Sequence, residues 1–196
     1  RDSSTSRGLG DVYKRQHYSM LHPPEMSLEN RMQCLYNLKR IGYQTGAGFM
    51  VGSPFQTSEM LVKDLKFIEK LSPEMCGIGP FVPHKDTKFK NENHGDVSLV
   101  LMLLSIIRLL KPNILLPATT ALGTVDPLGR EKGILHGANV VMPNLSPVKH
   151  RKDYSLYDNK ICTGDEAAQC IGCLADRMKK IGCEIVTDRG DYKADI

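Results

Sequence analysis

Apolar residues follow two different spacings along most of the chain, and the two spacings alternate. In the segment SLENRMQCLYNLKRIG they recur at helical intervals, with Ser27 placed to cap the start and Gly42 to end the helix. The following TGAGFMVG is a short apolar run bounded by glycines, which predicts a strand. The same reasoning predicts further helices in SEMLVKDLKFIEKLS, DVSLVLMLLSIIRLLKP and near PLGREKGILHG, and further strands in MCGIGPFV, NILLPA and ANVVMPN.

The predicted strands begin near residues 45, 75, 114 and 139, and they alternate with helices. This order is typical of parallel strands buried under helices. A complete barrel of eight β/α units needs about 250 residues, so the four units predicted here amount to half of one. We therefore predict an α/β fold in which residues 17–147 form half of a TIM-type barrel and residues 148–196 form a C-terminal extension.

Ligands of such barrels bind in the loops that follow the strands. Thr119 and Thr120 follow the third predicted strand, where their hydroxyls either bind a polar substrate or cap a turn. Arg31 lies on the apolar stripe of its helix, three residues after Leu28 and four before Leu35. A guanidinium in that position either binds an anion or extends to the edge of the stripe. The six histidines have no metal-ligand spacing and are expected to be surface or core groups.

Three cysteines stand close together in the segment ICTGDEAAQCIGC: Cys162, Cys170 and Cys173. No apolar run long enough to span a membrane and no secretion signal is evident, so the cytoplasm is the expected location. Disulfides are rare there, and clustered cysteines more often bind metal. Iron-sulfur chemistry favours thiolate ligands, so the spacing favours a metal site over three unrelated thiols.

The first sixteen residues, RDSSTSRGLGDVYKRQ, are polar and lack an apolar period. They resemble the leaders that vectors or assembly add to translated sequence fragments, and we expect residues 1–16 to be non-native to the fold. They carry four basic and two acidic residues, which is +2 of the net charge of +4. The remaining +2 is too small to indicate a nucleic-acid partner.

Several blocks of the sequence resemble the radical S-adenosylmethionine (radical SAM) enzymes of the biotin synthase-like branch, and among them the HydE family of FeFe-hydrogenase maturases. The blocks are YSMLHPPEMSLENRMQCLYNLKRIGYQTGAGFMVGSPFQT, GIGPFVPHKDT, PATTALGT, GREKGILHGANVVMPN and the closing cysteine motif. The resemblance runs from about residue 18 to the end. Some blocks also resemble biotin synthase and methylornithine synthase, and the cysteine motif is the more discriminating feature.

The resemblance implies an intact enzyme that cleaves S-adenosylmethionine (SAM) reductively to a 5'-deoxyadenosyl radical. That enzyme would act on a small organometallic or amino-acid-derived substrate, an iron-cysteine precursor of the two-iron unit of the hydrogenase, alongside other hydrogenase maturases. Its 4Fe-4S cluster would sit on a CxxxCxxC loop in the first half of the barrel. No CxxxCxxC occurs in this sequence. The chain is therefore similar to the C-terminal half of such an enzyme, is expected to be inactive alone, and has no residue assigned as catalytic.

The resemblance also implies roles for individual residues. The positions matched to SAM contacts are Arg31 and Met75. The positions matched to substrate contacts or to the cavity lining are Thr119, Thr120, Met142, Tyr154 and Tyr157. The ligands of an auxiliary 2Fe-2S or 4Fe-4S cluster would be Cys162, Cys170 and Cys173.

One loop departs from the family pattern. Where GLPGQT is usual, this chain has GSPFQT, with Ser53 in place of Leu and Phe55 in place of Gly. Phenylalanine reaches positive φ far less readily than glycine and adds bulk, so this loop is expected to be reshaped, with the cap of the next helix retained.

Two alternatives stay open. A methylornithine synthase or biotin synthase-like enzyme would share the barrel blocks, and the absence of a cluster at the three cysteines or turnover of lysine would favour it. A non-catalytic iron-sulfur or zinc module would share only the cysteines, and tetrahedral zinc without visible absorbance would favour that class.

Overall fold

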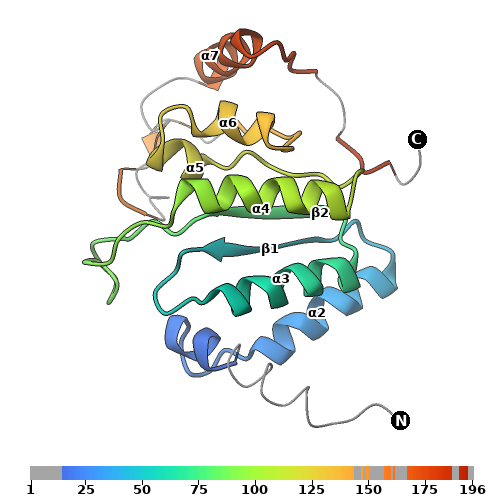
Figure 1. Cartoon of the computed structure of the whole chain (residues 1–196), viewed down its shortest axis with the longest axis vertical. Coiled ribbons are helices and arrows are strands. Elements are labelled where there is room, and N and C mark those ends of the chain that lie inside the picture. The colour runs from blue at the N-terminus through green and yellow to red at the C-terminus, as the bar shows by residue number, and fades with distance from the viewer. Residues whose placement is uncertain are drawn as a thin grey trace.

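The computed structural model describes residues 15–143, 147, 149–150, 157–159, 161, 167–186 and 190–193. Helices and strands alternate along it, and the helices stack above and below a short parallel sheet (Figure 1). The elements are α2 (Leu28–Ile41), β1 (Gly46–Val51), α3 (Ser58–Leu71), β2 (Met75–Pro80), α4 (Val97–Leu110), α5 (Thr120–Val125), α6 (Gly129–Leu135) and α7 (Ala167–Lys180). Residues 15–21 form a further helical segment before α2.

The predicted ends of the first helix are confirmed. The hydroxyl of Ser27 accepts a hydrogen bond from the N–H of Asn30, and Gly42 ends α2 in the left-handed region at φ 96°. Thr57 and Asp96 cap α3 and α4 in the same way, each accepting from a backbone N–H in the first turn. The short helix α5 was not predicted, because six residues that include a glycine carry little helical pattern.

The sheet is parallel, as predicted. Strand β1 pairs with β2 in a register that runs from Gly46 opposite Met75 to Val51 opposite Pro80. The third and fourth predicted strands are not full strands. They join the sheet through single parallel bridges. The third parallel segment, around Leu115 and Pro117, bridges to Met75 through Leu115, and the fourth, around Val140, bridges to Pro117. Pro117 lacks an N–H to donate to a ladder, which limits pairing at this position.

The core lies between the sheet and the helices that cover one of its faces. Along β2 the side chains alternate between buried and half-buried, and Cys76 and Ile78 point into the core. They pack in one cluster with residues of α4 and of the third parallel segment, including Leu104 and Leu116. The opposite face of β2 carries Met75, Gly77 and Gly79, of which two are glycines, so this face is nearly free of side chains.

Helix α7 is attached to the rest of the fold through α6. Arg177 binds the carboxylate of Glu131 with two nitrogens, at 2.5 and 2.6 Å. Leu174 and Met178 of α7 are buried. The appended helix predicted after residue 148 therefore packs on the described barrel segment. Within the described residues, no helix combines the length and the hydropathy that crossing a bilayer requires.

Candidate functional site

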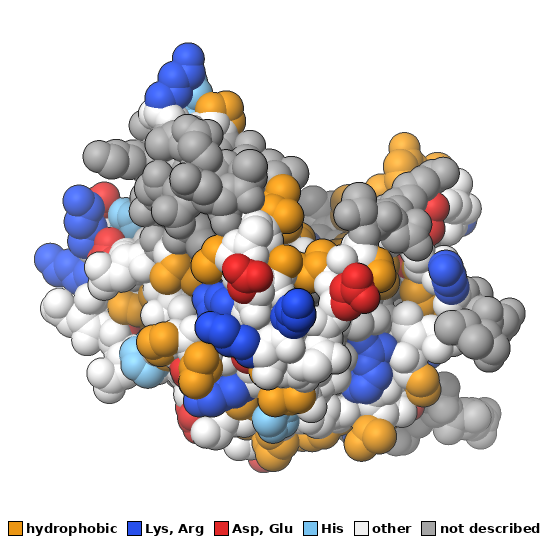
Figure 2. Space-filling view, turned by 90° about the horizontal axis from the view of Figure 1, so that it is seen from above, with side chains coloured by type: hydrophobic (Ala, Val, Ile, Leu, Met, Phe, Trp, Pro, Cys, Tyr) orange, Lys and Arg blue, Asp and Glu red, His pale blue; other side chains and the backbone are white. Residues whose placement is uncertain are grey.

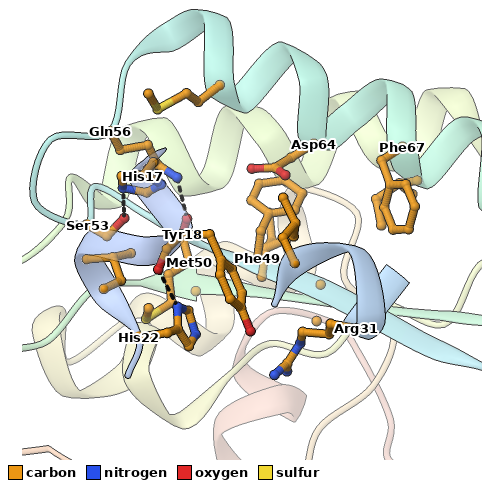
Figure 3. Close-up of a pocket in the computed structure, with 18 of the residues that line it drawn as sticks. His17, Tyr18, His22, Arg31, Phe49, Met50, Ser53, Gln56, Asp64 and Phe67 are labelled. Atoms are coloured by element: carbon orange, nitrogen blue, oxygen red, sulfur yellow. Dashed lines mark hydrogen bonds between the residues drawn. The ribbon is translucent and has the colours of Figure 1, made fainter. Parts of the chain in front are cut away.

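A pocket of about 490 Å³ lies along β1. Its walls come from the helical residues 15–21, from α2, from α3 and from the backbone of β1 and β2 (Figure 3). Thr119 and Ala121, where the third parallel segment leads into α5, complete the lining. The pocket thus joins the helical layer before β1 to the carboxyl end of the sheet, where the sequence predicted a ligand site.

Two of the predicted site residues line this pocket. Arg31 reaches it from α2, and Thr119 reaches it from the end of the third parallel segment. The Thr119 hydroxyl also accepts from the N–H of Leu122 and so caps α5. The two interpretations left open for Thr119 are therefore compatible, because the same hydroxyl caps a helix and borders the pocket.

Three glycines form part of the strand wall of the pocket. Gly48, Gly77 and Gly79 all line it. A Cβ on Gly79 would lie 2.7 Å from Oγ1 of Thr119, and a Cβ on Gly48 would lie 2.0 Å from the carbonyl oxygen of Gly77. Protein atoms therefore fill the space of a side chain at Gly48 and Gly79. A Cβ on Gly77 would meet nothing within 4 Å, so a ligand can approach the backbone closely there.

Two histidines that were expected to be surface or core groups instead line the pocket. Nε2 of His17 donates to the carbonyl of Pro54 at 3.0 Å and lies 3.3 Å from Oγ of Ser53. Nδ1 of His22 donates to the carbonyl of Tyr18, and its ring stacks on the Tyr18 ring with centroids 3.8 Å apart (Figure 3). Their spacing in the sequence did not indicate this position. Both rings are held by hydrogen bonds to backbone carbonyls, and a carbonyl leaves no sequence motif.

Tyr18 presents a buried phenol oxygen at this pocket. That oxygen has no hydrogen-bond partner among the residues that the structure describes. A buried hydroxyl without a partner is costly, so a polar group of a bound ligand would stabilise it. Asp64 adds an acidic side chain from α3, and Figure 3 shows it on the same helical wall as Phe67.

The loop after β1 is shaped by Gln56. Its side-chain oxygen accepts from the N–H of Gly52 at 2.6 Å, and its side-chain nitrogen donates to the carbonyl of Met50 at 2.8 Å. Thr57 then caps α3, as predicted. Phe55, the residue expected to alter this loop, lies at φ 66° and is 63% exposed.

Three other predicted residues are described but do not line this pocket. Met75 is the first residue of β2, and it precedes by two positions Gly77, the first residue of this strand that lines the pocket. Thr120 is half-buried, and its hydroxyl accepts from Nη2 of Arg130 at 3.2 Å. Met142, which follows the fourth parallel segment, is 50% exposed.

The predicted tyrosine pair is described only in part. Tyr157 is half-buried in a bend, and the N–H of the next residue, Asp158, donates to the carbonyl of Pro83 in the loop after β2. The segment around Tyr157 therefore lies against a loop at the carboxyl end of the sheet. Tyr154 lies outside the described residues, so the shared helical face predicted for the two is not tested.

The three-cysteine site also remains a prediction. Cys162 lies outside the described residues, and Cys170 belongs to α7 without a described side chain. Cys173, three positions further along the same helix, is exposed. Among the side chains that are described, no three histidine, cysteine, aspartate or glutamate residues are grouped as metal ligands.

Charged side chains of both signs are mixed on the face of the molecule that Figure 2 shows, and apolar side chains lie between them.

Comparison with known proteins agrees with the sequence motifs. No family model matches the chain. Over 170 residues, 87% of its length, the chain is 46% identical to the FeFe hydrogenase maturase subunit HydE of Thermotoga maritima and covers 49% of that protein. Over 178 residues it is 24% identical to the 3-methylornithine synthase of Methanosarcina acetivorans and covers 48% of it. The chain thus spans about half the length of the curated relatives that it matches.

The fold also matches a solved structure. The crystal structure of methylornithine synthase (PylB) superposes with a TM-score of 0.64, covering 84% of this chain and 47% of the other, at 22% sequence identity. This match supports the assignment of the parallel segments and their helices to part of a TIM-type α/β fold. At 46% identity over 87% of its length, the chain is similar to the maturase subunit HydE along about half of that protein.

Proposed function

We propose that this chain is the C-terminal half of a radical SAM enzyme that acts in FeFe-hydrogenase maturation. The observation that supports the proposal is the identity of 46% to HydE over 170 residues, against 24% to the methylornithine synthase over a similar length. On this proposal the chain is part of a longer enzyme, the complete protein. The chain alone is not expected to cleave SAM, because it contains no CxxxCxxC loop for a 4Fe-4S cluster.

The residues that line the pocket fit SAM. At Gly77 the strand wall is open, and it leaves room there for the flat face of an adenine or the edge of a ribose. Arg31 offers the fork of donors that suits the carboxylate of the methionyl group. The phenol of Tyr18 lacks a hydrogen-bond partner among the described residues and can bind a polar atom of the ligand.

The contribution of this half is binding and positioning. When bound beside a reduced cluster, SAM would supply the radical chemistry. Arg31 would hold the methionyl carboxylate, and the glycine wall would hold the nucleoside against the strands. The hydroxyls of Thr119 and Thr120 would orient the substrate, and the half-buried residues around them would limit access of water.

The proposed substrate is a small organometallic species, an iron-cysteine precursor of the two-iron unit of the hydrogenase, and the proposed partners are other hydrogenase maturases. Both proposals rest on the similarity to HydE. If the substrate carries a cysteine-derived carboxylate, hydroxyl donors at the carboxyl ends of the strands suit it.

Replacement of Arg31 tests the SAM site. In the complete protein with its cluster reconstituted, Arg31→Met should weaken SAM binding at least tenfold and lower 5'-deoxyadenosine formation in parallel, because a charge-assisted contact is lost. Arg40→Met is the matched control, since Arg40 is an exposed arginine near the end of the same helix that does not line the pocket. Equal binding by wild type and Arg31→Met would refute the assignment of Arg31.

The proposed auxiliary cluster needs its own test. Reconstitution with iron and sulfide should give visible absorbance that a triple replacement of Cys162, Cys170 and Cys173 by serine removes, in addition to the absorbance of the first cluster. Replacement of Cys34 and Cys183, which are not buried, is the control for loss of thiols in general. Zinc at the three positions without absorbance would instead favour the metal-module alternative.

A further inference from the structure

Arg130, on α6, is the most deeply buried arginine among the residues that the structure describes. It is 3% exposed. Nη2 donates to the hydroxyl of Thr120 at 3.2 Å, and Nε has no hydrogen-bond partner within the described part of the chain. A guanidinium remains protonated at all ordinary pH values, so the fold buries a positive charge that is only partly satisfied.

The neighbouring carboxylate does not form an ion pair with this charge. Glu131 is close enough for Arg130 to contribute to lowering its pKa, but both of its oxygens bind Arg177. No ion pair of Arg130 is found in the described residues. An arginine buried without a paired carboxylate costs stability, so packing alone does not explain why an arginine occupies this position.

Gly123 of α5 leaves space for the side chain of Arg130. A Cβ on Gly123 would lie 3.3 Å from Cγ and 3.4 Å from Nε of Arg130. The glycine in α5 therefore allows the guanidinium stem to pass toward Thr120. The hydrogen bond joins α6 to the start of α5, directly after the third parallel segment.

The contact decides how the Thr120 hydroxyl is used. A threonine hydroxyl has one proton to donate, and its oxygen accepts. Because the oxygen already accepts from Arg130, and no acceptor for the proton is found among the described residues, the hydroxyl is left to donate. Thr120 is half-buried rather than enclosed, and its neighbour Thr119 lines the pocket.

We propose that Arg130 is a positioning residue that fixes the Thr120 hydroxyl as a donor to a carboxylate of the substrate. The buried charge also polarises that hydroxyl and strengthens the bond to an anion. This inference rests on the proposed function in one respect, which is that Thr120 contacts the substrate.

The test is ligand binding by the complete protein, measured by calorimetry without turnover. The probes are S-methyl-L-cysteine and its amide, which differ in the carboxylate. Arg130→Met and Thr120→Val should each weaken binding of the acid about tenfold and change binding of the amide much less. The double variant should lose no more than Thr120→Val alone, because Arg130 acts through Thr120.

Lys132→Met is the control. It removes a cation from the same helix, but Lys132 is paired with Asp126 near the surface, so binding of the acid should not change. If Arg130→Met does not fold, Arg130→Lys and Arg130→Gln replace it, and Lys should bind the acid while Gln should not.

Four results would overturn the proposal: unchanged binding in Arg130→Met, losses that add in the double variant, equal losses for acid and amide, or a wild type that binds neither probe. The proposed function fails on a different readout, the absence of 5'-deoxyadenosine. The two failures are therefore distinguishable.

Discussion

Phe55 is held in a backbone conformation that suits glycine. The N–H of Gln56 donates to the carbonyl of Ser53, and Pro54 and Phe55 occupy the centre of this turn with Phe55 at φ 66°. A turn with proline first and positive φ second is the arrangement of type II, which favours glycine at the second position. Phe55→Gly in the complete protein should raise the free energy of unfolding by about 0.5–1 kcal/mol, measured from urea midpoints.

Phe55→Ala separates the conformational effect from the loss of an exposed aromatic ring. Alanine keeps the steric cost of positive φ, so this variant should not gain stability. A gain equal to that of glycine would show that ring exposure, not the turn, is responsible.

Cys76 should be unreactive in the folded protein. Burial, with a smaller contribution from Asp64, raises the pKa of its thiol to about 12, so almost no thiolate exists at neutral pH. Iodoacetamide at pH 8 should label the exposed Cys34 within minutes and leave Cys76 unlabelled until denaturant is added. Peptide mass spectrometry measures both sites in one sample, and early labelling of Cys76 would contradict its place in the core.

At the scale of elements, the contact between α6 and α7 depends on pH. Hydrogen bonds from Arg177 lower the pKa of Glu131 below its ordinary value of 4.5, against the effect of burial. A carboxyl with a lowered pKa in the folded state adds stability above its unfolded pKa and loses it as pH falls through the folded value. Arg177→Met should therefore cost about 2 kcal/mol at pH 7 and much less at pH 3, measured from urea midpoints.

Lys180→Met is the matched control for α7, because Lys180 is a cation in the last turn of the same helix and is exposed. It should leave stability nearly unchanged at both pH values. A loss in Arg177→Met that is the same at pH 3 and pH 7 would mean that packing, not the ion pair, attaches the helix.

At the scale of the whole molecule, the sheet has an open side. Within the described residues β1 pairs only with β2, so its other edge has no strand partner there. An unpaired parallel edge and a glycine-rich face are sites for aggregation. The 196-residue chain on its own should therefore associate and unfold gradually rather than cooperatively, measured by circular dichroism and size-exclusion chromatography. A sharp thermal transition with monomeric elution would contradict this.

Local signals were sufficient where the chemistry is local. Ser27 and Gly42 could be recognised as the ends of α2, because capping depends on residue type within one turn. Phe55 could be identified as an unusual residue for its loop, because the preference for negative φ is a property of the residue type. The lengths of the third and fourth strands could not be predicted, because pairing depends on the neighbouring segment and on the missing donor at Pro117.

The sequence alone determined the alternation of the main helices with strands and their parallel sense, because periodicity and local residue types encode these features. Only the tertiary structure decided which residues share a site. It placed Arg31 and Thr119 on one pocket although 88 positions separate them (119 − 31), and it added His17, Tyr18 and His22. It also joined Arg130 to Thr120. These contacts depend on how helices cross the sheet, which is set by packing across the whole fold rather than by any short segment.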